Sequence, residues 1–434
     1  MDDSVEYLAP RVAVGVCLLG LICIYVIYYR LFNVTRPRVV CKDADRLQGL
    51  RRHCPALFEH YWPTFWAPQG HVQSIVRLLM QQAPSVESLG GRRETIKMSD
   101  GGHVCLDWFE SCEEDGGGNQ GGPIVLILCG MTGSSKETYT RHWVDDCRRL
   151  GYRCVVFNYR GCGNSKLSTP KLFSLGDVDD LTEVADYLHF HNPSSTIVAV
   201  GVSMGSVQLI RYVAECRRKA RPCRISAGLV FSVIWSLRES DKALHTNLFN
   251  KHVISRFLTR RYRNLIKENR QVFEDFQARN ELCCDYEKAL RSTYLREMNE
   301  AYVIPMFSYH HEPMQQSHSP CENVGELTIP VIAVNAVDDP FCPADAIPED
   351  VAEANPNLIL VTTRRGGHIG FMQGLFPFRK TYMDRVLSQF LTGVLEHDCL
   401  SSSSSSSSSS LSLGEESHAF LLGDCELENH ALLT

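Results

Sequence analysis

The stretch Ile197-Val198-Ala199-Val200-Gly201-Val202-Ser203-Met204-Gly205 decides how this chain folds. Its apolar, mostly β-branched first part predicts a buried strand, and the apolar spacing of residues 207–215 predicts a helix directly after it. The pattern G-x-S-x-G between them is typical of a sharp, strained strand-to-helix turn that exposes a serine hydroxyl at the edge of a sheet. The pattern also occurs in ordinary turns, so the strand and helix around it carry the interpretation. We therefore expect Ser203 to act as a nucleophile.

Short apolar runs alternate with helical patterns on both sides of this turn. Because such alternation is typical of parallel strands joined by crossover helices, we expect an α/β fold, a mainly parallel sheet with helices on both faces. The expected strands cover residues 124–129, 154–159, 197–202, 229–234, 331–334 and 358–361. A hairpin is expected over 95–110, around the turn Asp100-Gly101-Gly102. Residues 176–191 predict a helix on the sheet, with Ser174 as its N-cap.

A nucleophilic serine needs a base to take its proton, and the base needs an acid to orient it. Asp339 follows the expected strand 331–334 and begins a D-P-x-x-P turn, so we prefer it to Asp338, which we expect to cap or support the loop. His368 lies between glycines after the last expected strand. The order Ser203, Asp339, His368 is that of the α/β-hydrolase fold, with His368 as general base.

Backbone N–H groups are expected to stabilise the oxyanion that forms when a serine attacks a carbonyl. One should come from Met204, directly after the nucleophile, and the other from Met131 in Gly130-Met131-Thr132-Gly133, after the strand 124–129. The alternative for Gly130 and Gly133 is an ordinary turn.

Composition argues against several classes of partner. The formal net charge of -6 offers no concentrated basic surface, so we expect no nucleic acid partner. The eighteen cysteines lack the spacing of a zinc site, and we expect neither a metal nor a cofactor. The cysteines fit a mostly reduced domain that faces the cytosol. The alternative is a lumenal domain with a few disulfides. We expect His310-His311 on a solvated surface. The residues carry no signal for the oligomeric state.

Residues 12–29 form an uncharged apolar run between Arg11 and Arg30, long enough to span a membrane. A cleaved signal peptide is the competing interpretation, but bulky tyrosines and Arg30 follow where small residues would be cleaved. We expect a single-pass anchor, with the endoplasmic reticulum as a candidate membrane. The main domain is expected in the cytosol because most basic residues follow the run. The sequon Asn33-Val34-Thr35 favours a lumenal domain but would sit against the bilayer.

The expected organisation is an anchor at 1–35, a lead-in segment at 36–93, a hydrolase domain at 94–397 and a disordered serine-rich tail at 398–434. The aromatic pairs near residues 61–66 are expected to pack rather than to form a site, and 113–122 reads as a glycine-rich loop. A helix-rich insertion at about 236–328 precedes the strand that delivers the acid, where a lid would sit. Its basic residues fit lipid phosphates or an ordinary solvated face equally well.

Together these motifs resemble the AB hydrolase 4 family, particularly its animal branch of single-span phospholipases and esterases. The resemblance runs from about 36 to 397. It implies a serine hydrolase acting on acyl esters of membrane lipids, with phosphatidylcholine-type glycerophospholipids as the substrate class, and places Ser203, Asp339 and His368 on the family's triad. It is carried by Tyr61-Trp62-Pro63-Thr64-Phe65-Trp66, Asp100-Gly101-Gly102, Gly130-Met131-Thr132-Gly133-Ser134-Ser135-Lys136-Glu137-Thr138-Tyr139, Gly201-Val202-Ser203-Met204-Gly205, Asp338-Asp339-Pro340-Phe341 and Gly366-Gly367-His368-Ile369-Gly370-Phe371.

Two departures from the family's pattern affect specificity. Ser206 stands where the family usually has a glycine, which would crowd the helix after the turn or reshape the acyl pocket. The loop Tyr159-Arg160-Gly161-Cys162-Gly163 also varies. The alternatives are a carboxylesterase, an acylglycerol lipase, an acyltransferase or, with less support, a non-catalytic membrane interaction protein.

Overall fold

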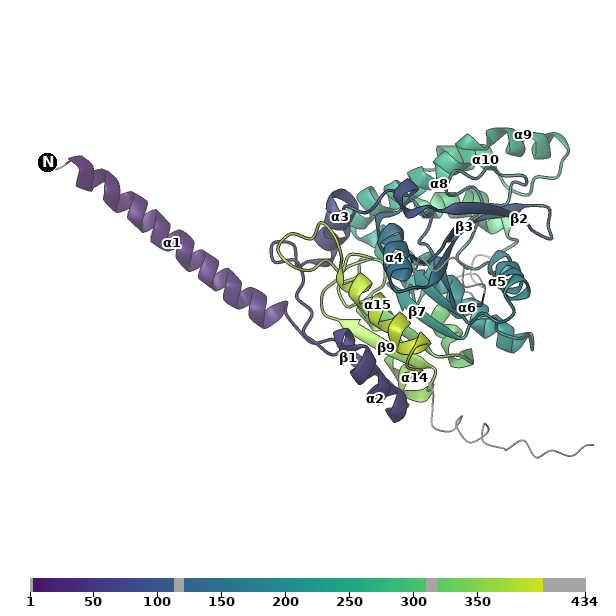
Figure 1. Ribbon diagram of the computed structural model, residues 1–434. Helices are drawn as coiled ribbons and strands as arrows, with labels where there is room; N and C mark the ends of the chain where they lie inside the picture. Colours follow the sequence, from purple (N-terminus) through teal and green to yellow (C-terminus); the bar gives the residue numbers. More distant parts are fainter. Residues whose placement is uncertain (1–2, 113–120, 310–318, 401–434) are drawn as a thin grey trace, which may run out of the picture.

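The computed structural model describes residues 3–112, 121–309 and 319–400, and a nine-stranded sheet forms the centre of its main body (Figure 1). Strands β4 to β9 run parallel, whereas β1, β2 and β3 are antiparallel to their neighbours. The mainly parallel sheet expected from the sequence is confirmed. The strand order is β1-β9-β8-β7-β6-β4-β5-β3-β2. The strands are β1 Arg38–Val40, β2 Arg92–Lys97, β3 His103–Phe109, β4 Ile124–Leu128, β5 Arg153–Asn158, β6 Ile197–Val202, β7 Ala227–Phe231, β8 Val331–Ala336 and β9 Leu358–Thr363.

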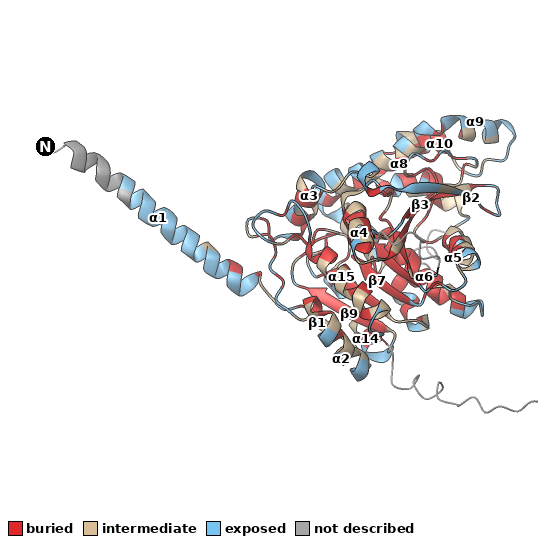
Figure 2. Ribbon diagram, in the orientation of Figure 1, coloured by how far each residue is buried: buried red, intermediate tan, exposed pale blue. Residues whose placement is uncertain are grey.

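Central strands are buried on both faces, which explains their continuous apolar sequences (Figure 2). The hairpin β2–β3 turns at Gly101, whose φ of +83° favours glycine. One strand differs from its expected range: β7 begins at Ala227 and ends at Phe231 rather than covering 229–234. Ser232 leaves the extended conformation with φ +52°, and its hydroxyl accepts a hydrogen bond from the N–H of Ile369. The strand therefore ends where Ser232 bonds the loop that carries His368.

Crossover handedness decides which face each helix covers. Since parallel crossovers are right-handed, the step from β4 to β5 places α4 on one face, and the opposite steps to β6 and β7 place α5 and α6 on the other. Helix α15 packs against α4 and covers its face. These helices are α4 Thr138–Arg149, α5 Asp179–His191, α6 Met204–Arg218 and α15 Tyr382–Leu395, with the short α14 Glu349–Ala354 between β8 and β9.

The start of α5 corrects one expectation. The helix begins at Asp179, with Val178 at the N-cap position and no side-chain cap. Ser174 does not cap it, because its hydroxyl accepts the N–H of Gly176 in a local turn four residues earlier in the chain.

The lead-in segment is built into the main body. It contributes β1, which pairs antiparallel with β9, and β2 already begins at Arg92. Tyr61 is buried and donates its hydroxyl to the carbonyl of Met372, whereas Trp62 and Trp66 remain about half exposed. Its helices are α2 Ala44–His53, η1 Pro55–Leu57, α3 Gly70–Met80 and η2 Glu87–Leu89.

The insertion between β7 and β8 is helical, as its sequence predicts. Tyr262 and Tyr302 anchor it to the main body by donating their hydroxyls to the carbonyls of Phe173 and Pro170. The predicted tail is described only to Leu400, and the loop 113–122 and His310-His311 lie wholly or mostly outside the described residues. The insertion's elements are α7 Leu237–Thr246, η3 Asn250–Ser255, α8 Arg256–Glu268, α9 Arg270–Ala278, α10 Tyr286–Arg291, α11 Leu295–Met298, η4 Asn299–Val303, α12 Ile304–Met306, η5 Pro320–Glu322 and η6 Val324–Glu326.

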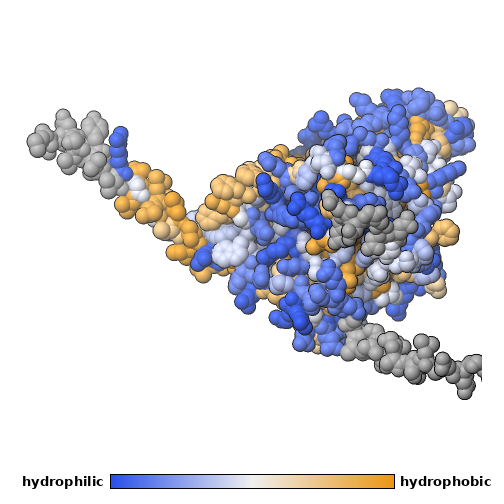
Figure 3. Space-filling view, in the orientation of Figure 1, coloured by the Kyte–Doolittle hydropathy of each residue, from blue (hydrophilic) through white to orange (hydrophobic). Residues whose placement is uncertain are grey.

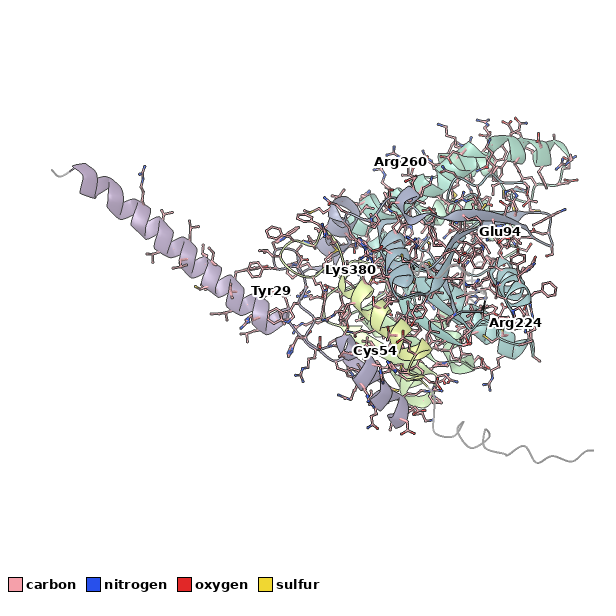
Figure 4. All side chains as sticks on the ribbon, in the orientation of Figure 1. Tyr29, Cys54, Glu94, Arg224, Arg260 and Lys380 are labelled. Atoms are coloured by element: carbon pink, nitrogen blue, oxygen red, sulfur yellow. The ribbon has the colours of Figure 1, made fainter. Side chains whose placement is uncertain are left out.

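Helix α1, Asp3–Phe32, projects away from the main body and is apolar along most of its length (Figure 3). Its segment Ala13–Phe32 has a mean hydropathy of 2.1 and is only 6% buried, so it is long and apolar enough to cross a membrane. Its base contacts the body. Tyr29 lies at this base (Figure 4) and donates its hydroxyl to the carbonyl of Pro63, and the side-chain oxygen of Asn33 accepts from Arg365.

Candidate active site

Ser203 lies on the turn between β6 and α6, at the carboxyl edge of the parallel strands. Its φ of +54° and ψ of -114° are strained for a residue with a side chain. The flanking glycines make the turn possible: a Cβ at Gly201 would stand 2.7 Å from the carbonyl oxygen of Gly205, and a Cβ at Gly205 would collide with the carbonyl of Leu128 on β4. The turn therefore needs G-x-S-x-G for steric reasons.

Three residues far apart in sequence meet at this edge. The hydroxyl oxygen of Ser203 lies 2.8 Å from Nε2 of His368, and Nδ1 of the same ring lies 2.9 Å and 3.1 Å from the two carboxylate oxygens of Asp339. Because the carboxylate can only accept, it selects the tautomer with hydrogen on Nδ1. The other nitrogen is then free to accept the hydroxyl proton of Ser203.

Asp339 is held on its other side by backbone donors. Its side chain is fully buried, and one oxygen accepts the N–H of Phe341 at 2.7 Å and that of Cys342 at 3.3 Å. The ring of Phe341 stacks on the imidazole of His368 with ring centroids 4.0 Å apart. The acid and the imidazole are therefore fixed in both position and plane.

The loop around His368 is fastened by side chains from three other elements. Ser74 on α3 accepts the N–H of His368 at 3.0 Å, and Ser232 accepts that of Ile369 at 2.9 Å. Asp338 accepts the N–H of Gly367 at 2.9 Å, and burial raises the pKa of its carboxyl. Asp338 thus supports the histidine loop while its neighbour Asp339 faces the imidazole.

Sequence reasoning missed Ser232 and two further supports of this loop. Ser74 and Arg77 both lie on α3, in the segment expected to be a lead-in. Arg77 donates to the carbonyl of Ile369, lies 5.2 Å over the ring of Tyr139, and has its pKa lowered to about 10 by burial. The available signal was a serine and an arginine at helical spacing among the apolar residues of α3.

The expected oxyanion donors lie beside Ser203. Met204 is the first residue of α6, so its N–H has no acceptor within the helix. Met131 follows β4 and lines the same cavity as Ser203, and no acceptor for its N–H occurs within residues 3–112, 121–309 and 319–400. The preceding residue, Gly130, is fixed by donating its N–H to the hydroxyl of Tyr139 at 3.0 Å. Two backbone donors are thus available near the serine.

A cavity of about 820 Å³ opens onto Ser203 and His368, between the main body and the helical insertion. This volume lies within the range that ordinary small-molecule ligands occupy. Most of its lining is apolar, which suits an acyl chain. Apolar lining residues include Met131, Phe173, Ile234, Leu244, Leu258 and Ile304.

The two departures from the family pattern lie outside this cavity's lining. Ser206 is fully buried, and its hydroxyl donates to the carbonyl of Ser203. The added side chain therefore braces the turn rather than reshaping the acyl pocket. Arg160 pairs with Asp100 of the hairpin and Asp180 of α5, so its loop serves the architecture. Among the residues that the structure describes, no group of three or more His, Cys, Asp and Glu side chains could hold a metal ion.

Fold and site together define a serine hydrolase. Residues 123–375 match the family model described as alpha/beta hydrolase fold. The chain is 34% identical to the Homo sapiens protein "Phospholipase ABHD3" over 385 residues, covering 88% of this chain and 90% of that protein. It is 25% identical to the Bos taurus protein "Monoacylglycerol lipase ABHD2" over 403 residues, covering 89% and 93%. The Pyrococcus furiosus esterase Pf2001 is similar over 72% of this chain and 98% of its own, with 17% identity and a TM-score of 0.44.

The chain belongs to the α/β-hydrolase family, in its animal phospholipase branch. It is a hydrolase of the serine type that acts on lipid esters.

Proposed function

We propose that this chain is a membrane-anchored phospholipase in which Ser203, His368 and Asp339 form the catalytic triad. The observation that carries the proposal is the 2.8 Å contact between the Ser203 hydroxyl and Nε2 of His368, beside a largely apolar cavity. A hydroxyl paired with a neutral imidazole becomes a nucleophile when the imidazole takes its proton.

The reaction proceeds in two stages. In the first, Ser203 attacks the ester carbonyl while His368 takes its proton, and the oxyanion accepts hydrogen bonds from the N–H groups of Met131 and Met204. The imidazolium then protonates the leaving alcohol, and the acyl group stays on Ser203. In the second stage His368 takes a proton from a water molecule as the water oxygen attacks the acyl carbonyl. The bond between the acyl carbon and Ser203 Oγ then breaks, the imidazolium returns its proton to the serine oxygen, and the fatty acid is released. Asp339 stabilises the imidazolium in both stages.

The test is substitution of Ser203 by alanine in the full chain. Ser203→Ala should abolish both lipid hydrolysis and labelling by a fluorophosphonate probe, because no other hydroxyl lies against His368 Nε2 among the described residues. A circular dichroism spectrum like that of the native chain would show that the fold survives. Labelling at the native level would reject Ser203 as the nucleophile.

Glycerophospholipids of the phosphatidylcholine type are the proposed substrates. Arg238 supports this choice: it is exposed, lines the cavity, and makes no ion pair within the described ranges. A guanidinium in that position suits a phosphate diester. The name of the human relative, "Phospholipase ABHD3", supports a phospholipid substrate.

Acylglycerol hydrolysis is the second candidate, favoured by the relative named "Monoacylglycerol lipase ABHD2". Arg238→Gln separates the two. A charge-assisted hydrogen bond is worth about 2 kcal/mol, so kcat/KM for phosphatidylcholine should fall about thirtyfold while monoacylglycerol turnover stays the same. An equal effect on both substrates would contradict phosphate recognition by Arg238. Product analysis with added alcohol would identify an acyltransferase or a simple carboxylesterase.

We infer that α1 anchors the chain with its main body in the cytosol. The basic residues that follow α1 favour that side. The sequon asparagine, Asn33, is 1% exposed and bound by Arg365, so its side chain is unsuited to glycosylation. Retention in membranes after alkaline washing would support the anchor, and digestion of the main body by protease added to sealed microsomes would support the orientation. Protection of the main body from the protease would instead place it in the lumen.

A further inference from the structure

We propose that a second membrane contact surrounds the mouth of the cavity, so that the substrate enters from the leaflet into which α1 inserts. The contact is an apolar surface, the mouth patch, and its occupant is the acyl region of that leaflet. This inference rests on the proposed anchoring by α1. It adds a defined surface of the main body that α1 alone does not require. The mouth patch consists of Leu78, Leu79, Leu248, Phe249, Leu375 and Phe376.

The mouth patch is unusually apolar for an exposed surface. Leu79, Leu248 and Phe376 are 76%, 73% and 72% exposed. Large apolar side chains that gather on one face of a soluble body usually mark an interaction site. The three come from α3, from the turn between α7 and η3, and from the loop before α15, so separate parts of the chain build one surface.

Contacts between these parts make the surface continuous. The ring of His71 on α3 lies edge-on to Phe249, with ring centroids 5.1 Å apart. At the other end of α3, the N–H of Gln82 donates to the carbonyl of Phe378 at 2.7 Å. Helix α3 therefore holds the insertion on one side and the loop with Leu375 and Phe376 on the other.

The cavity opens through the mouth patch. Leu78, Leu79 and Phe249 are exposed to solvent and at the same time line the cavity that reaches Ser203. A side chain can do both only where the cavity meets the surface. An acyl chain entering there would exchange a lipid environment for an apolar lining without crossing water.

The patch is joined to the base of α1, which identifies its occupant. Trp66 donates its indole N–H to the carbonyl of Leu375 at 2.8 Å, and Tyr25 on α1 donates its hydroxyl to the carbonyl of Phe65 at 2.6 Å. Figure 3 shows apolar surface continuing from α1 along the edge of the main body. Exposed tryptophans beside the end of a membrane helix are typical of the interface.

Basic side chains lie where lipid phosphates would meet this surface. Arg256 and Arg260 on α8 are exposed and flank Phe257, which lines the cavity. Figure 4 places Arg260 on the outer edge of the body, at α8. An apolar centre with basic residues beside it matches the arrangement of interfacial membrane-binding surfaces.

The test places a charge on the patch in the full chain reconstituted in phosphatidylcholine vesicles. Leu248→Glu and Phe376→Glu are suitable, because neither residue lines the cavity. Each should lower hydrolysis of the vesicle lipid about tenfold or more, since a large apolar group no longer enters the leaflet, while hydrolysis of soluble p-nitrophenyl butyrate stays at the native level. Phe190→Glu is the matched control: Phe190 is 79% exposed but lies on α5, away from α1 (Figure 1). It should change neither activity.

A direct measurement complements the activity assay. Phe376→Trp and Phe190→Trp each add one indole, and brominated acyl chains quench only indoles that reach the leaflet. Quenching of the added emission in Phe376→Trp alone supports the inference. Quenching of neither, or native vesicle hydrolysis by both glutamate variants, overturns it.

The outcomes separate this inference from the proposed function. Loss of soluble-ester hydrolysis in Ser203→Ala tests the triad, and retention after alkaline washing tests the anchor. If both of these hold while the glutamate variants behave like Phe190→Glu, only the mouth patch is rejected.

Discussion

Removing one hydroxyl from α3 should slow catalysis without removing any triad residue. Ser74 accepts the N–H of His368 at 3.0 Å and donates to the carbonyl of Gly70 on its own helix. Ser74→Ala leaves the buried N–H of His368 without its partner. The imidazole would then lose the support that holds it toward Ser203.

The expected magnitude follows from that single bond. A buried donor without a partner costs about 1–3 kcal/mol. If the loop moves to avoid this cost, the fraction of molecules in which His368 faces Ser203 falls by about 5- to 150-fold. The second-order rate of fluorophosphonate labelling and kcat/KM for a soluble ester should fall by the same factor, because both depend on the pairing of Ser203 with His368.

A matched control separates alignment from general stability. Ser388 on α15 makes the same bond to the carbonyl four residues earlier, that of Asp384, and within the described part of the chain it neither lines the cavity nor hydrogen-bonds a residue of the site. Ser388→Ala should therefore leave labelling unchanged. Ser74→Thr, which restores a hydroxyl, should recover most of the rate. If Ser74→Ala lowers the melting temperature while labelling stays within twofold of native, the positioning role is refuted.

Further substitutions test the site and the core. Asp339→Asn should lower kcat by about 10⁴-fold while the chain stays folded, because the imidazole would be held in the wrong tautomer; near-native turnover would exclude Asp339 as the orienting acid. Gly205→Ala should reduce the yield of folded protein sharply, because its Cβ meets the carbonyl of Leu128. Burial raises the pKa of Asp146 to about 6, so this group favours folding when protonated, and its contribution is lost as pH rises toward that value. The free energy of unfolding of Asp146→Asn, measured with denaturant, should therefore rise by up to about 3 kcal/mol relative to that of the native chain between pH 4 and pH 7. If the difference between the two free energies does not change with pH, the raised pKa is contradicted.

The meeting of Ser203, Asp339 and His368 at one edge was predictable because each of them follows a strand. Ser203 comes directly after β6, and Asp339 and His368 lie on the loops that follow β8 and β9. Parallel strands deliver their carboxyl ends to one edge of the sheet. Strand and loop signals are local in sequence, so they can be read from a single chain.

Other features depend on tertiary contacts and could not be read in that way. Ser74 and Arg77 support the histidine loop from a helix nearly 300 residues earlier, and nothing in the local sequence of α3 names that partner. The apolar residues after Ser232 predicted a longer strand. In the structure β7 ends at Phe231, and the next residue, Ser232, accepts a hydrogen bond from the distant Ile369. Serine is a common N-cap residue, but the hydroxyl of Ser174 already accepts the N–H of Gly176 in a local turn.

The way α1 joins the body has a practical consequence for any shortened form of the enzyme. Asn33 accepts from Arg365, three residues before His368, and Tyr29 bonds the aromatic segment that supports the loop after it. A deletion ending at residue 35 would therefore take away part of the scaffolding of the histidine loop along with the hydrophobic helix. A soluble version intended for kinetics should keep the last turns of that helix, with its outward-facing leucines and isoleucines replaced by polar residues.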